Sequence, residues 1–218
     1  LKNINCRGFW GNFSDMTFLQ FQNGYHQYEM LNYFNVNNDL FETAAINVSL
    51  MSDQFGHFAP YPGGGGCFDY DAIFMITNFL KNNSNYDYLI SKTLNSILNS
   101  QNSDGGFSES KFIRPKSLNN LLLALKHVVN SNNYLSRKES IRYNLTLLRG
   151  KHNEIHTHWS NSPRAWSESN LWDSWFRMLT IARISMALKF TKDDYWGFIN
   201  FPGIGYHSES DVDFINQH

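Results

Sequence analysis

The most concentrated set of chemically reactive side chains lies between Gly56 and Asp71. This segment reads Gly-His-Phe-Ala-Pro-Tyr-Pro-Gly-Gly-Gly-Gly-Cys-Phe-Asp-Tyr-Asp. Four consecutive glycines give a backbone that adopts positive φ and lets a ligand approach closely. One aspartate at a helix start is explained by N-capping alone, because its carboxylate accepts from free N–H groups. The second carboxylate, together with His57 and Cys67, favours a site in this segment.

Polar and aromatic side chains also gather where other helices are predicted to begin, in 25–29 and 166–177. In a radial array of helices, such starts converge on one end of a central cavity. Acids, a histidine and an arginine within an aromatic wall suit general acid/base chemistry or metal binding. We assign catalysis to Asp71, Asp69, Glu168 and His26. Substrate binding is assigned to His57, Glu29, Tyr70, Trp172, Asp173 and Arg177, and to Tyr206 and His207 of a C-terminal turn that folds over the open edge.

Each assignment has a structural alternative. Asp173 and Arg177 stand four positions apart, which suits an intrahelical ion pair. Trp172 suits a core position, and Glu168 suits the first turn of a helix, where it faces the dipole. His26 suits a hydrogen-bonded position within a helix. The two interpretations differ in whether the helix starts meet at one place.

Turns that combine glycine with an aromatic residue recur along the chain and organise these segments. The aromatic residues follow one another at intervals of 49, 49 and 52 residues, at Phe9, Phe58, Phe107 and Trp159. Between the turns, apolar residues recur with helical spacing. Helices are predicted over 22–34, 41–51, 71–80, 90–98, 118–129, 138–149 and 167–189. Period-2 alternation is weak, so we predict one all-α domain, 1–218, built from about four stacked helical hairpins.

The composition excludes several classes of protein. The 18 basic and 19 acidic residues are spread along the 218-residue chain and nearly cancel, which argues against a nucleic-acid partner. No apolar run approaches the roughly 18–20 residues that cross a bilayer. The N-terminus lacks the pattern of a signal peptide, so we expect a cytoplasmic protein. Two cysteines are too few for a disulfide scaffold, and a small-molecule substrate is the expected partner.

Two motifs carry a resemblance to a known superfamily. The segment Gln101-Asn-Ser-Asp-Gly-Gly-Phe107 resembles the turn that joins helical hairpins in squalene-hopene-type cyclases and protein prenyltransferase β subunits. Asp69-Tyr-Asp-Ala72 resembles the Asp-x-Asp-Asp motif of class II terpene cyclases, whose middle Asp protonates the substrate. The resemblance implies a partial α/α-toroid with Asp71 as the acid. Phe107 replaces the usual Trp, and Ala72 replaces the final Asp.

The resemblance also implies a metal. Prenyltransferase β subunits bind zinc through Asp, Cys and His, and Cys67 lies two residues from Asp69. These two residues and His26 are therefore the candidate ligands for a divalent ion, zinc or magnesium. A full toroid has more hairpins than 218 residues supply, so the resemblance implies a reduced or truncated version.

The leading functional hypothesis is an enzyme similar to prenyltransferases and terpene cyclases, with an acidic, aromatic-lined cavity. One alternative is a carbohydrate-active α/α-barrel enzyme, in which Glu29 or Glu168 pairs with Asp71 across a glycosidic bond. A second alternative is a non-catalytic helical-repeat binding protein, which predicts no buried carboxylate cluster and no perturbed pKa values.

Overall fold

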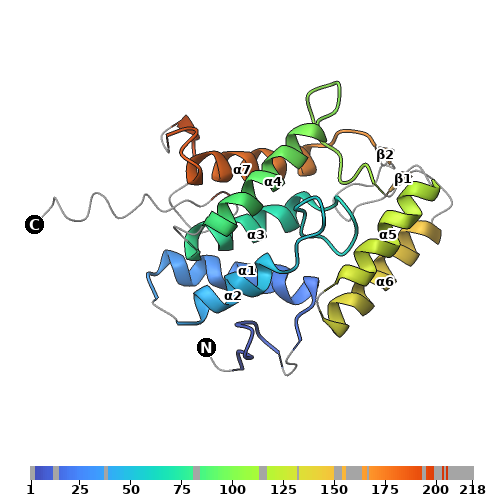
Figure 1. Ribbon diagram of the computed structural model, residues 1–218. Helices are drawn as coiled ribbons and strands as arrows, with labels where there is room; N and C mark the ends of the chain where they lie inside the picture. Colours follow the sequence, from blue (N-terminus) through green and yellow to red (C-terminus); the bar gives the residue numbers. More distant parts are fainter. Residues whose placement is uncertain are drawn as a thin grey trace, which may run out of the picture.

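The computed structural model describes residues 3–11, 15–36, 39–80, 84–112, 117–131, 133–149, 154–155, 164–165, 167–192, 195–198, 203 and 205. This part of the chain contains seven α-helices and one antiparallel pair of two-residue strands, so the all-α prediction is confirmed (Figure 1). The helices are α1 (Phe18–Tyr33), α2 (Leu40–Ser49), α3 (Gly66–Phe79), α4 (Ser84–Asn99), α5 (Leu118–Asn130), α6 (Tyr134–Arg149) and α7 (Leu171–Ala187). The strands are β1 (Glu154–Ile155) and β2 (Arg164–Ala165). In the described residues, no helix is both long and apolar enough to span a membrane.

Helix α3 lies at the centre of the fold. Every residue from 68 to 76 is buried, as expected of a helix that is apolar on most of its sides. It packs against α1, α2 and α7, and α7 packs in turn against α4 (Figure 1). Aromatic rings fill the interface between α3 and α1, where the centroids of Tyr25 and Phe74 are 5.2 Å apart.

Local signals explain where the helices begin. At α1, Thr17 accepts from the Gln20 backbone N–H and Gln20 accepts from the Thr17 N–H, which completes a capping box. Asn170 caps α7 by accepting from the Asp173 N–H at 2.9 Å, so this helix starts four residues later than predicted. Helix α3 starts five residues earlier than predicted, because it continues through Cys67 to Gly66.

Three turns share one backbone hydrogen-bond frame. In 5–9, 53–57 and 102–106, the first N–H donates to the fifth carbonyl at 2.8, 2.7 and 2.9 Å. The fourth N–H donates to the first carbonyl at 3.0, 3.0 and 2.9 Å. The fourth residue is a glycine with a φ of 84°, 86° and 86°, at Gly8, Gly56 and Gly105. Positive φ favours glycine, so the spacing of these glycines follows from the turn geometry.

The first two of these turns also contact equivalent helices. A Cβ at Gly8 would lie 2.7 Å from Ala44 Cβ on α2, and a Cβ at Gly56 would lie 2.9 Å from Thr93 Oγ1 on α4. The Thr93 hydroxyl donates to the Gly56 carbonyl at 2.7 Å. Each turn therefore packs closely against the second helix that follows it.

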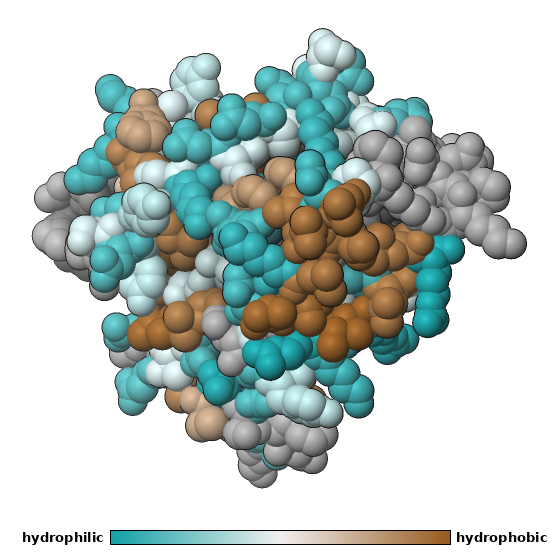
Figure 2. Space-filling view, turned by 45° about the vertical axis from the view of Figure 1, so that its right-hand side comes forward, coloured by the Kyte–Doolittle hydropathy of each residue, from teal (hydrophilic) through white to brown (hydrophobic). Residues whose placement is uncertain are grey.

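The α5/α6 hairpin stands to one side of this core (Figure 1). In α5, only Ala124 and His127 are buried. Its apolar side chains point outward, and Figure 2, turned to bring this side forward, shows a broad apolar patch. The exposed apolar residues of the helix are Leu118, Leu121, Leu122, Leu125 and Val129.

Polar contacts hold this hairpin against the core. Glu139 on α6 accepts from the Phe18 N–H at 2.5 Å and from the Leu19 N–H at 3.1 Å. Both N–H groups belong to the first turn of α1, where no carbonyl of the helix can reach them. Asn144 adds a bond from Nδ2 to the Pro60 carbonyl at 3.2 Å.

We expect Glu139→Ala to lower the free energy of unfolding by about 1–2 kcal/mol, because it removes a charged cap from α1. Urea denaturation followed by circular dichroism measures the change. Lys138→Ala, at the exposed neighbouring position, is the matched control and should stay within about 0.5 kcal/mol of the unmodified protein. Equal stability of the two variants would contradict the capping role.

Candidate functional site

Asp69, in the first turn of α3, lies at the centre of a buried charge network. Its side chain has no exposed surface. Oδ2 forms an ion pair with Nη1 of Arg177 and lies 2.7 Å from Nδ1 of His57. Oδ1 accepts from the Phe58 N–H at 2.8 Å. One carboxylate thus joins α3, α7 and the loop that precedes α3.

Arg177 contributes the positive charge from α7. Its side chain is only 1% exposed, and Nη2 donates to the Glu109 carbonyl at 3.2 Å. A buried guanidinium is tolerated only when an opposite charge and acceptors compensate for its lost hydration. Asp69 and Arg177 were predicted to lie close together. In the structure they form a buried ion pair between α3 and α7.

His57 is oriented by this carboxylate. Nδ1 is 2.7 Å from Asp69 Oδ2 and 3.2 Å from Arg177 Nη1, and one nitrogen cannot both donate to Asp69 and accept from Arg177. The shorter contact assigns a proton to Nδ1. Nε2 is buried and has no hydrogen-bond partner among the described residues.

Asp53 holds the His57 loop in place, and its role was not predicted. Oδ1 accepts from the Phe55 and His57 N–H groups at 2.7 and 2.9 Å. Oδ2 accepts from the Gly63 N–H at 2.8 Å. The Ser-Asp start that this turn shares with the turn at 103–104 was the available sequence signal.

A second cluster surrounds Asp71, which is 3% exposed. Burial, reinforced by Glu29 and Asp69, raises the pKa of the Asp71 carboxyl well above its usual range. Burial also raises the pKa of Glu29, against the lowering effects of the Tyr25 hydrogen bond, of Arg183 and of the Gly203 backbone. The Tyr25 hydroxyl donates to Glu29 Oε1 at 3.1 Å. Burial and the two neighbouring carboxyl groups therefore favour the protonated form of Asp71.

Aromatic rings and one cation accompany this acid. Tyr25 lies edge-on to Phe74, and its centroid is 6.1 Å from that of Tyr70. The Arg183 guanidinium sits 4.4 Å from the Phe74 centroid and 5.5 Å from that of Tyr70, within the range of cation–π contacts. Sequence reasoning assigned no role to Tyr25 or Arg183. The sequence signal for Arg183 was its charge within a largely apolar helix.

The C-terminal segment borders the same cluster. Gly205 is buried, and its N–H donates to the Tyr70 hydroxyl at 3.0 Å. The Gly203 backbone is hydrogen-bonded to Glu29. The residues predicted to enter the site from this segment, Tyr206 and His207, lie outside the described residues.

The four glycines before α3 are explained by packing. The loop from Gly56 to Gly66 is buried throughout. A Cβ at Gly63 would lie 1.9 Å from the Phe112 ring, and one at Gly64 would lie 1.9 Å from the Tyr61 ring. The close approach that these glycines permit is therefore made by aromatic side chains of the protein itself.

The other predicted site residues lie apart from the two clusters or at their edges. His26 and Glu168 are exposed. Asp173 is buried at the start of α7, where its Oδ2 accepts from Asn170 Nδ2 at 2.7 Å. Trp172 is half-buried and packs edge-on against Phe176, with centroids 4.8 Å apart. Asp69 lies with Arg177, and Asp71 lies with Glu29. Glu29 belongs to the C-terminal half of α1, so this second pairing does not join two helix starts as predicted.

The suggested metal ligands do not fit a zinc or magnesium site. Sγ of Cys67 accepts from Gln22 Nε2 at 3.3 Å, and burial raises the pKa of its thiol, which opposes formation of a thiolate ligand. Asp69 is engaged by Arg177 and His57. No group of three His, Cys, Asp or Glu side chains in the described residues is arranged to hold a metal ion. We assign no metal-dependent step.

In comparisons with protein-family models, curated proteins and solved structures, the chain has no match. Its chemistry must therefore be derived from its own residues. Those residues form two buried clusters on α3, one ionic and one neutral.

We expect Asp69→Asn to lower the free energy of unfolding by about 3–5 kcal/mol, because it leaves the Arg177 charge buried without a counter-ion. Denaturant titration measures the loss. Asp69→Leu combined with Arg177→Met should cost less than the sum of the two single changes, since it removes both charges together. Asp87→Asn, at an exposed position of α4, is the control. Additive losses in the double variant would show that the pair does not interact.

Proposed function

We propose that this protein is a general acid/base enzyme similar to isoprenoid cyclases, with Asp71 as the proton donor. The observation that carries the proposal is a buried carboxyl group, with a pKa raised well above its usual range, beside aromatic rings. An acid that protonates an alkene must keep its proton at neutral pH and be shielded from water. Burial and the neighbouring Glu29 provide both conditions.

We further propose that the helical hairpins are repeats arranged as a partial α/α-toroid. The shared hydrogen-bond frame of the turns at 5–9, 53–57 and 102–106 supports a repeat. The equivalent contacts of Gly8 with Ala44 and of Gly56 with Thr93 support it as well. In such an array the buried helix α3 is an inner helix, which agrees with an active site on α3.

The proposed reaction begins when Asp71 transfers its proton to an alkene carbon of an apolar substrate. The π electrons form the new C–H bond and leave a carbocation. The rings of Tyr25, Tyr70 and Phe74 stabilise that positive charge, and the cation–π distances of Arg183 from Tyr70 and Phe74 support this role. The Asp71 carboxylate that remains beside the cation then accepts a proton from a neighbouring carbon, and the electrons of that C–H bond close a new alkene.

The carboxyl pair is less suited to glycoside hydrolysis. A glycosidase needs one protonated and one ionised carboxyl group across the scissile bond. Burial raises the pKa of both Asp71 and Glu29, which disfavours the ionised partner. The same shifts disfavour a non-catalytic helical-repeat binding protein, since that alternative predicts no buried carboxylate cluster and no perturbed pKa values.

We expect Asp71→Asn to reduce turnover of linear polyprenes by about 10²–10⁴-fold, because the amide keeps the shape of the acid but has no proton to give. Squalene, 2,3-oxidosqualene and geranylgeraniol are the test substrates, and gas chromatography with mass spectrometry detects products. Asp87→Asn is the matched control and should retain full activity. Full activity of Asp71→Asn, or no conversion of any of the three substrates by the unmodified protein, would contradict the proposal.

The raised pKa of Asp71 also predicts a pH-dependent stability. The folded protein keeps this proton to a higher pH than the unfolded chain, whose aspartate titrates near pKa ~3.9. The stability from this group is therefore complete below about pH 4 and is lost as the pH rises through the raised folded value. Denaturant titrations from pH 4 to pH 8 should show the unmodified protein losing stability relative to Asp71→Asn. A constant difference across that range would show that folding does not raise the pKa of Asp71.

A further inference from the structure

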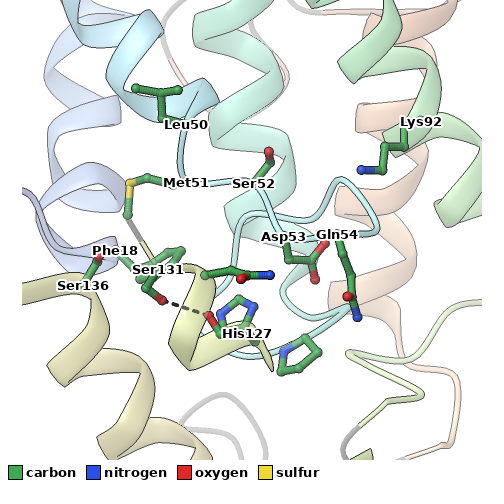
Figure 3. A pocket seen from close by; sticks show the side chains of 12 residues that line it. Phe18, Leu50, Met51, Ser52, Asp53, Gln54, Lys92, His127, Ser131 and Ser136 are labelled. Carbon is green, nitrogen blue, oxygen red and sulfur yellow. Dashed lines mark hydrogen bonds between the residues drawn. The ribbon is translucent and has the colours of Figure 1, made fainter. Parts of the chain in front are cut away.

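A separate cavity lies where the α5/α6 hairpin meets the core (Figure 3). Its volume is about 320 Å³, at the lower end of the range for small-molecule pockets. The loop after α2, α4, α5 and α6 contribute its polar lining, which includes Ser52, Gln54, Lys92, His127 and Ser131. Phe18, Leu50 and Met51 supply an apolar part of the wall. None of these residues belongs to the Asp71 cluster.

His127 is the most informative residue of this cavity. It is 8% exposed, and Figure 3 shows its imidazole projecting from α5 toward the loop that carries Asp53 and Gln54. The ring is stacked with Phe18, with centroids 6.3 Å apart and planes at 28°. Burial lowers the pKa of His127, against the raising effects of Asp53 and of a hydrogen bond to the Pro60 carbonyl. The imidazole is therefore neutral and has one acceptor nitrogen.

That acceptor nitrogen is Nε2. It is buried and has no hydrogen-bond partner in the described part of the chain, so the bond to the Pro60 carbonyl falls to Nδ1. Gln54 Oε1 lines the same cavity and is likewise buried without a partner there. A buried acceptor that receives no hydrogen bond destabilises the protein by the free energy of its lost hydration. Two such acceptors in one cavity therefore indicate a ligand that presents hydrogen-bond donors.

The charged residues that line the cavity restrict the net charge of the ligand. Asp53 carries a carboxylate beside the two acceptors, and its oxygens already accept from backbone N–H groups, so an anion would be repelled. Lys92 contributes an ammonium group to the same cavity, which disfavours a cation. Hydroxyl groups satisfy both limits, because a hydroxyl donates to one acceptor while it accepts from a serine or lysine donor.

We propose that this cavity binds a neutral polyhydroxyl molecule of monosaccharide to disaccharide size. Two hydroxyls of the ligand donate to His127 Nε2 and Gln54 Oε1. Its C–H face packs against the apolar wall formed by Phe18 and Met51. This site is independent of Asp71, so it can be present in a protein whose proposed cyclase activity fails its own test, and the reverse also holds.

The test uses the full chain and saturation-transfer NMR with D-glucose, D-galactose, N-acetyl-D-glucosamine and myo-inositol as probes. D-Glucosamine and D-glucuronate, cationic and anionic derivatives that keep the glucose ring, are the charge controls. We expect at least one neutral probe to bind with a dissociation constant of about 10 mM or tighter, and both charged probes to bind at least about tenfold more weakly. Binding of no neutral probe, or equal binding of a charged one, would overturn the proposal.

Two variants place the binding in this cavity. His127→Phe keeps the stack on Phe18 but removes the acceptor, and it should weaken binding by at least about tenfold. Ser52→Phe fills the cavity from the opposite wall and should abolish binding, while Ser91→Phe, at a half-buried position outside the cavity, should not. The thermal unfolding of each variant is measured in parallel. Unchanged binding by folded His127→Phe and Ser52→Phe would show that the probes bind elsewhere.

Discussion

The ion pair between Asp69 and Arg177 is the contact around which this protein is arranged. Both side chains are removed from water, so each charge needs the other. Because Asp69 lies on α3 and Arg177 on α7, the pair sets how the two central helices face each other. The same carboxylate accepts from His57 and from the Phe58 backbone N–H. These two hydrogen bonds hold the glycine-rich loop that precedes α3 against both helices. A polar network thus organises a core that is otherwise aromatic.

Two aspartates in one helix have opposite electrostatic states because of helix geometry. A separation of two residues turns a side chain by about 200° around the helix axis. Asp69 therefore points toward α7, where it pairs with Arg177. Asp71 points to another side of the helix, where it lies near Glu29 and aromatic rings. The first stays engaged in structure and orients His57. Burial and Glu29 favour the protonated form of the second, and this difference allows neighbouring carboxyl groups to take different roles in acid/base chemistry.

The α5/α6 hairpin is attached to the core by a different kind of contact. It is attached through hydrogen bonds of Glu139, Asn144 and Asn133, the last to the Met16 carbonyl at 2.9 Å. Leu147 of α6 also packs against the core. Polar attachment leaves space between the hairpin and the core, and the cavity beside His127 lies in that space. The leucine stripe of α5 remains on the outside.

The sequence by itself determined the helices and turns. Apolar spacing predicted α5 within one residue of its observed end, and the glycine positions predicted turns at Gly8, Gly56 and Gly105, because local backbone preferences decide both. The acidic start of α3 also pointed to the part of the chain where charges meet. Tertiary structure alone decided that Asp69 pairs with Arg177, that Glu29 raises the pKa of Asp71, and that His26 and Glu168 face solvent. Those outcomes depend on how each helix is rotated about its axis, and a few tens of degrees, set by packing of distant side chains, moves a residue from core to surface.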